Sequence, residues 1–269
     1  MCNVFGQWLI DHSKQAQVYA ELAGANNIVI DSTNAYKAML GNLAFTLSLY
    51  SGQMCTTSQA IIVPANGIDT DEGHKSYDEV CADLAKSVEK FLSKPEVACA
   101  VLGAIQSSAT ADRIDLANSG KLGKVVLAST KLSNPEFTGA DVRTPVLLAC
   151  DAADESAYME ERFGPISFIV KAADTTAAIA LSERIVNTHG ALTVGLYSTH
   201  QEVIDAMTHA TWRGKVALSI NLTSGVFVNQ SSAFSDYHGT GGNPSANASY
   251  ADSAFVANRF RVVQRRYHV

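Results

Sequence analysis

The chain has 269 residues, a formal net charge of −6 and 47% hydrophobic residues. This length and apolar content can fill a sizeable core, so we expect a globular protein. The acidic balance excludes a basic surface for nucleic acid or anionic membranes, and no run of Lys or Arg precedes Arg265 and Arg266. Because the sequence has neither a membrane-length apolar stretch nor a signal-peptide pattern at its start, we expect a cytoplasmic protein.

The five cysteines are odd in number and irregularly spaced, which indicates neither a disulfide framework nor a CxxC metal site. The seven histidines include no His-x-x-x-His pair beside a carboxylate, a pattern that zinc sites often use. We therefore expect no metal, and we expect most of the thiols to be buried.

Apolar runs alternate with helical stretches along most of the chain. The runs predict strands at residues 27–30, 60–63, 146–149, 166–170, 193–197 and 216–220. The periodic stretches predict helices near residues 34–49, 77–92, 175–186 and 201–210. Short apolar strands separated by helices indicate an α/β fold with a mostly parallel sheet.

The tail of the chain has a different composition. After Val226 it is rich in Gly, Ser and Asn, which predicts a loop, and a strand-like end with Phe260, Val262 and Val263 follows. A terminal strand with an uncovered edge often pairs with another chain, so we expect a homo-oligomer, although a frayed tail is about as common.

Cys55 lies in a connection of small residues between a long apolar helix and the strand at residues 60–63. Such a connection exposes backbone amides, which can activate a thiol and hold the oxyanion that forms when the thiolate attacks a carbonyl. An isolated cysteine is more often a buried packing residue, so the position alone favours packing.

Two further segments change this balance. Glu21 precedes a glycine turn before the strand at residues 27–30, and a partly buried carboxylate with a raised pKa there can deprotonate the water that hydrolyses a thioester at Cys55. Glu161 and Phe163 flank the turn before the strand at residues 166–170. A carboxylate can accept hydrogen bonds from a ribose, and an aromatic face can pack on a nicotinamide ring. Each segment alone would more often be a charged helix end.

In this order, the three segments resemble the motifs of the aldehyde dehydrogenase superfamily, which are Glu-Leu-Gly-Gly, Gly-Gln-x-Cys and Glu-x-Phe-Gly-Pro. The resemblance implies that Cys55 is the nucleophile and Glu21 the general base. It also implies that Glu161 binds the ribose of NAD or NADP and that Phe163 packs on the nicotinamide. The departures are Ala23, where the family has glycine, and a long stretch between the cysteine and the Phe-Gly-Pro motif. Neither removes a reacting group.

The resemblance covers essentially the whole chain and implies three parts. Residues 1–30 are a remnant of the Rossmann-like nucleotide-binding domain, residues 31–230 are the catalytic domain, and residues 231–269 hold a tunnel loop and a terminal oligomerisation strand. The family's Gly-Ser-Thr-x-x-Gly turn falls where the chain starts, so Gly6 is expected to begin a phosphate-facing helix and to bind the cofactor. A lone glycine there is ordinarily just a turn. The family's amino-terminal half is expected to be absent.

A closer likeness is to the phenylacetate-degradation aldehyde dehydrogenases called PaaN. They share a leucine-tyrosine lead into residues 51–56 and a tail like residues 234–241. The likeness implies a CoA-linked semialdehyde as substrate and places Phe234 at the substrate tunnel; no hydratase domain is expected here. A loop histidine such as His238 is more often a surface or hydrogen-bonded residue than a catalytic one, and Glu21 already supplies a base.

These resemblances predict NAD(P)-dependent oxidation of an aldehyde to a carboxylic acid through a thiohemiacetal and a thioester at Cys55. One alternative is a truncated, non-catalytic α/β fragment that associates with a complementary domain. Others are a Cys-dependent hydrolase and a CoA-acylating aldehyde dehydrogenase, because CoA and water attack the same thioester.

Overall fold

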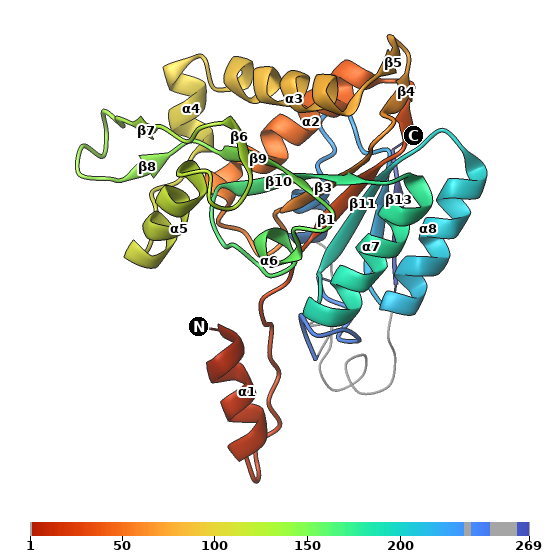
Figure 1. Ribbon diagram of the computed structural model, residues 1–269. Helices are drawn as coiled ribbons and strands as arrows, with labels where there is room; N and C mark the ends of the chain where they lie inside the picture. The colour runs from red at the N-terminus through yellow and green to blue at the C-terminus, as the bar shows by residue number, and fades with distance from the viewer. Residues whose placement is uncertain (1, 234–237, 248–262, 269) are drawn as a thin grey trace.

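A computed structural model describes residues 2–233, 238–247 and 263–268. Its centre is an eight-stranded sheet in the order β13-β12-β11-β1-β3-β10-β9-β6 (Figure 1). In chain order these strands are β1 (Asn27–Ile30), β3 (Ala60–Pro64), β6 (Lys124–Leu127), β9 (Val146–Asp151), β10 (Ile166–Ala172), β11 (Thr193–Tyr197), β12 (Ala217–Ile220) and β13 (Arg265–Tyr267). Only β6 pairs antiparallel within this sheet, so the expected α/β fold with a mostly parallel sheet is confirmed.

Helices cover both faces of the sheet. One face packs on α2 (Tyr36–Ser48), α3 (Tyr77–Phe91) and the short α9 (Val228–Ala233). The other face packs on α5 (Ser108–Asn118), α6 (Glu155–Tyr158), α7 (Thr175–His189) and α8 (Gln201–Gly214). Because both faces are covered, every residue of β1, β3 and β11 is buried, and their continuous apolar runs were readable in the sequence.

The smaller elements lie outside this sheet. They are α1 (Cys2–His12), β2 (Ser32–Thr33), the 3₁₀ turn η1 (Leu49–Gly52), β4 (Ile68–Thr70), β5 (Gly73–Lys75), α4 (Pro95–Val101), β7 (Lys131–Leu132) and β8 (Val142–Arg143). No helix in the described ranges is long and apolar enough to cross a membrane.

Two elements of the tail differ from expectation. Helix α9 occupies part of the stretch predicted as loop, and it is tied to the fold by polar groups: the Thr56 hydroxyl donates to the Asn229 carbonyl and the Asn229 amide to the Thr46 carbonyl. The last strand begins at Arg265, whereas Val263 precedes it and Phe260 and Val262 lie outside the described residues. This strand is a polar edge strand beside β12, which a search for apolar runs does not find.

Helix α1 stands apart from the sheet and is joined to it by an extended segment (Figure 1). It begins at Cys2 and not, as expected, at Gly6; Gly6 lies inside the helix, where an added Cβ would be 2.5 Å from the Leu22 side chain. Strand β1 lies between β11 and β3 and is therefore part of the central sheet.

The buried side chain of Asn26, just before β1, joins three separate parts of the fold. Its amide nitrogen donates to the carbonyl oxygens of Cys55 at 2.7 Å and Thr57 at 3.1 Å. Its amide oxygen accepts from the backbone of Leu192 at 2.9 Å and Thr193 at 3.1 Å. Asn26 therefore fixes the Cys55 loop to the amino-terminal ends of β1 and β11.

We predict that Asn26→Asp destabilises the fold. The carboxylate keeps an acceptor for Leu192 and Thr193 but places an oxygen against the Cys55 and Thr57 carbonyls, which lose their donor. The free energy of unfolding, measured by urea titration, should fall by about 2–4 kcal/mol. The matched change Asn66→Asp, in an exposed turn, should stay within about 0.5 kcal/mol. Equal losses in the two variants would contradict the role of Asn26.

Candidate active site

The loop that carries Cys55 has a strained backbone and is held by side-chain hydrogen bonds. After α2, the residues Tyr50, Ser51 and Gly52 have positive φ angles of 53°, 53° and 63°. The Ser51 hydroxyl donates to the carbonyls of Gly103 at 2.9 Å and Arg143 at 2.8 Å. Such a backbone persists only where its surroundings hold it, so these hydrogen bonds stabilise the turn that presents the thiol.

Two sequence motifs meet at Gly52. A Cβ added there would lie 2.8 Å from the Gly164 carbonyl carbon and 2.9 Å from the Pro165 Cα, and the φ angle is already in the left-handed region. Only glycine tolerates both conditions without a shift of backbone. The cysteine loop is thus packed directly against the Phe-Gly-Pro turn.

Glu21 lies on a segment that is held by the tail of the chain. The Leu22 amide donates to the Ser245 carbonyl at 2.7 Å, and the Ala20 amide donates to the Asn247 side chain at 2.7 Å. Glu21 itself forms an isolated β-bridge with Ala246. The same tail carries His238, so one segment positions both a carboxylate and an imidazole.

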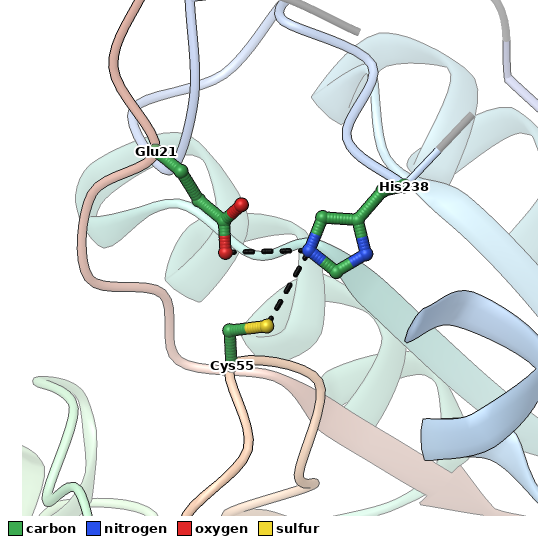
Figure 2. Close-up of side chains that lie close together, drawn as sticks. All are labelled: Glu21, Cys55 and His238. Carbon is green, nitrogen blue, oxygen red and sulfur yellow. Dashed lines mark hydrogen bonds and ion pairs between the residues drawn. The ribbon is translucent and has the colours of Figure 1, made fainter. Parts of the chain in front are cut away.

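Cys55 and Glu21 both contact one ring nitrogen of His238 (Figure 2). The His238 Nε2 lies 3.4 Å from the Cys55 Sγ and 3.3 Å from the Glu21 Oε1. The His238 Nδ1 lies 3.2 Å from the Ser232 carbonyl oxygen. The structure thus brings together the two residues expected to react, and it adds a histidine that was not expected to be catalytic.

The contacts at His238 shift the protonation of both partners. Hydrogen bonds to Cys55 and then to Glu21 raise the pKa of His238 to about 10, against the effect of burial. The hydrogen bond from His238 lowers the pKa of Glu21 below its usual range, although partial burial opposes this, so the pKa is not raised as was expected for a partly buried base. At neutral pH the pair is therefore an imidazolium beside a carboxylate.

Glu161 and Phe163 lie beside the cysteine loop. With Gly24, Gly52 and Met54 they line a small hollow next to Cys55. Burial raises the pKa of Glu161, and the Gly24 amide donates to its Oε1 at 3.5 Å. This segment is held by the buried Gln59, whose amide nitrogen donates to the Tyr158 and Glu160 carbonyls at 2.8 Å.

The remaining expected site residues are placed less directly. Gly6 is buried in α1 against Leu22, and Phe234 lies outside the described residues. The ligand atoms of Glu21, Cys55 and His238 lie within 4.8 Å of one another, a spacing that a metal site also needs. The imidazole of His238 already contacts both the Cys55 thiol and the Glu21 carboxylate. The expectation of a site without metal stays a prediction.

The structural anchors Asn26 and Ser51 were not identified from the sequence, since nothing local marks an amide or a hydroxyl as a link between distant strands. His238 had a signal, because it lies in the tail motif that follows the catalytic segments.

Comparison with known proteins agrees with this architecture. The Aldehyde dehydrogenase family profile matches residues 5–251. The crystal structure of an NAD-dependent aldehyde dehydrogenase from Burkholderia multivorans is 53% identical, with a TM-score of 0.90, over 97% of this chain and 46% of that one. A curated N-succinylglutamate 5-semialdehyde dehydrogenase of Pseudomonas fluorescens (strain Pf0-1) is 26% identical over 231 residues, which are 86% of this chain and 44% of that protein.

A more distant structure shares the fold. The 1-pyrroline-5-carboxylate dehydrogenase from Thermus with bound NAD has a TM-score of 0.64 at 19% identity, over 94% of this chain and 47% of that one. The chain spans less than half the length of each of these three relatives. Because the family profile matches most of its residues, the chain belongs to the aldehyde dehydrogenase family.

Proposed function

We propose that the protein carrying this chain oxidises an aldehyde to a carboxylic acid with NAD or NADP, using Cys55 as nucleophile and Glu21 as general base. The observation that carries this proposal is that the Cys55 Sγ and the Glu21 Oε1 both contact the same imidazole nitrogen, at 3.4 and 3.3 Å respectively. Both groups are only partly exposed, as a thiol and a base that must meet substrate should be.

The first half of the reaction takes place at the sulfur. The Cys55 thiolate adds to the aldehyde carbon, and the product is a thiohemiacetal held on the loop that Asn26 and Ser51 anchor. When bound, NAD(P) would supply the oxidant for this step, as acceptor of a hydride from this carbon. The former aldehyde carbon is then bonded to the Cys55 sulfur as a thioester.

The second half releases the acid. Glu21 has a lowered pKa and is ionised at neutral pH, so it can accept a proton from water that attacks the thioester. Cys55 leaves as a thiolate and is ready for another turnover. The net change is oxidation of the aldehyde, reduction of the nucleotide and consumption of one water.

The residues beside Cys55 fit such a cofactor. Glu161 is a half-buried carboxylate at a hollow, and among the described residues the Gly24 amide donates to it at 3.5 Å, so it has acceptor capacity left for ribose hydroxyls. Phe163 lines the same hollow and can pack on the nicotinamide. We place Gly6 near the phosphates on resemblance alone.

The division of the chain remains part of this proposal. Residues 1–30 would belong largely to a nucleotide-binding part, and helix α1 supports this because it stands apart with Val4 78%, Phe5 62% and Trp8 53% exposed. Side chains of this kind are normally covered by other protein. Residues 31–230 would form the catalytic part and residues 231–269 the tunnel loop and a strand for homo-oligomer formation.

For the substrate we propose a CoA-linked semialdehyde of phenylacetate catabolism. The motif around Cys55 and the tail containing Phe234 and His238 support it, and the Pseudomonas fluorescens relative is named for another semialdehyde. Comparing a CoA-linked with a short free aldehyde tests this: a kcat/KM no higher for the CoA-linked compound would refute it.

We predict that Cys55→Ser abolishes aldehyde-dependent reduction of NAD(P), measured by the absorbance of the reduced nicotinamide. The hydroxyl is a far weaker nucleophile than a thiolate. The matched change Cys99→Ser, at another half-buried free cysteine, should keep the activity. Undiminished turnover in Cys55→Ser would refute the assignment.

We predict that Glu21→Gln slows hydrolysis of the thioester and leaves its formation largely intact. Steady-state turnover should fall about 10²–10⁴-fold because the amide cannot accept a proton. A burst of reduced nucleotide, close to one per site, should remain in rapid-mixing experiments. The control Glu160→Gln, at an exposed carboxylate, should behave as the parent; a lost burst in Glu21→Gln would assign Glu21 to the first half-reaction.

Two alternatives are distinguished by binding and product. Micromolar binding of NAD(P) to residues 1–269 alone, measured by calorimetry, would contradict the alternative of an inert fragment. Release of an acyl-CoA in place of the free acid when CoA is added would instead identify a CoA-acylating enzyme, because the acyl group then leaves Cys55 to a thiol.

A further inference from the structure

We infer that His238 is a catalytic residue that takes the proton of the Cys55 thiol and keeps the sulfur as a thiolate whenever it is not bonded to substrate. Its part in turnover rests on the proposed function, but its effect on the thiol does not. In the transfer, the S–H bond of Cys55 breaks and an N–H bond forms at the His238 Nε2. The sulfur keeps the electron pair, so no oxidant or further reactant is needed.

The hydrogen bonds of the imidazole give the direction of this transfer. The Ser232 carbonyl oxygen can only accept, so the His238 Nδ1 at 3.2 Å carries a proton. In the neutral ring the Nε2 then has a free lone pair, and this atom is 3.4 Å from the Cys55 Sγ. The thiol hydrogen is the nearest proton that the lone pair can accept.

Glu21 stabilises the charged ring that results. Its Oε1 lies 3.3 Å from the same Nε2, and the side chains of His238 and Glu21 are 17% and 32% exposed. Limited exposure reduces screening between the imidazolium and its two anionic partners. Glu161 is a further titratable group on this side of the site, and the negative charge of Glu21 contributes to raising its pKa.

The segment that holds His238 is tied to the fold. The Thr240 hydroxyl donates to the Lys215 carbonyl, and the Asn243 side chain donates to the Ala191 carbonyl at 2.9 Å. Ser232, which contacts the other ring nitrogen, lies near the end of α9. The ring is therefore held by described contacts at both of its nitrogens.

A lasting imidazolium assists two steps. It holds Cys55 as the thiolate that attacks the aldehyde, and it stabilises the same thiolate when the thioester is hydrolysed. Glu21 takes its proton from water and returns it to solvent. His238 does not need to change its protonation during the cycle.

The test measures the thiol and not aldehyde oxidation. Iodoacetamide alkylation of Cys55 is followed by mass spectrometry from pH 5 to 9, with a chelator present and Cys99 as internal reference. In the parent protein the rate at pH 6 should be close to that at pH 8, whereas an ordinary thiol loses roughly tens of fold over this range. A steep fall in the parent protein would overturn the inference without any variant.

The variant His238→Gln keeps a donor near both partners but cannot accept a proton. Its Cys55 alkylation rate at pH 7 should fall about tenfold to thirtyfold, and the profile should move to higher pH. The control His74→Gln removes an exposed histidine that is likewise bonded to a carboxylate and to a backbone carbonyl, and it should match the parent.

The two proposals fail in different ways. An unchanged Cys55 profile in a folded His238→Gln protein overturns the role of His238, even if aldehyde oxidation is found. A shifted profile without any aldehyde-dependent nucleotide reduction supports His238 and overturns the proposed function. Ultraviolet absorbance of the thiolate, as the difference between the parent and Cys55→Ser at pH 6, gives an independent readout, and its absence would also contradict the inference.

Discussion

The site depends on the side chain of Asn26, which makes four hydrogen bonds to backbone groups of two other segments. Its amide holds the carbonyls on both sides of Thr56, and its oxygen holds the start of β11. Since parallel strands have no hairpin to set their relative positions, such a side-chain link is what places the nucleophile loop at the end of the central strands. The strain in the Tyr50–Gly52 turn is tolerable because this link and Ser51 hold the loop from two sides.

The groups proposed to be catalytic come from segments far apart in sequence, and the tail of the chain brings them together. Residues 243–247 hold the backbone of Ala20 and Leu22, and the same tail contributes His238. The position of Glu21 relative to Cys55 thus depends on the last part of the family match as much as on the central sheet. Loss of the contact between Ser245 and Leu22 would therefore act on catalysis without touching a reacting atom.

Much of the fold and part of the site were predictable from the sequence. Strands such as β1 and β11 are buried on both faces, so they appear as apolar runs, and Cys55 and Glu21 lie in motifs of fixed order. The polar strand β13 and the short helix α9 were not predictable, because pairing and side-chain hydrogen bonds form them without an apolar pattern. The meeting of His238 with both reacting groups depends on long-range packing, which local sequence does not encode.

The two carboxylates of the site have opposite environments, and this separates their roles. Glu21 contacts an imidazolium, which lowers its pKa, whereas burial raises the pKa of Glu161. A carboxylate that remains ionised at neutral pH suits proton abstraction from water, and a half-buried one with few donors suits hydrogen bonding to hydroxyl groups of a ligand. The negative charge of Glu21 itself raises the pKa of Glu161, so the two assignments reinforce each other. With His238 charged and Glu21 ionised, a second negative charge, on Glu161, becomes less favourable until a ligand donates hydrogen bonds to it.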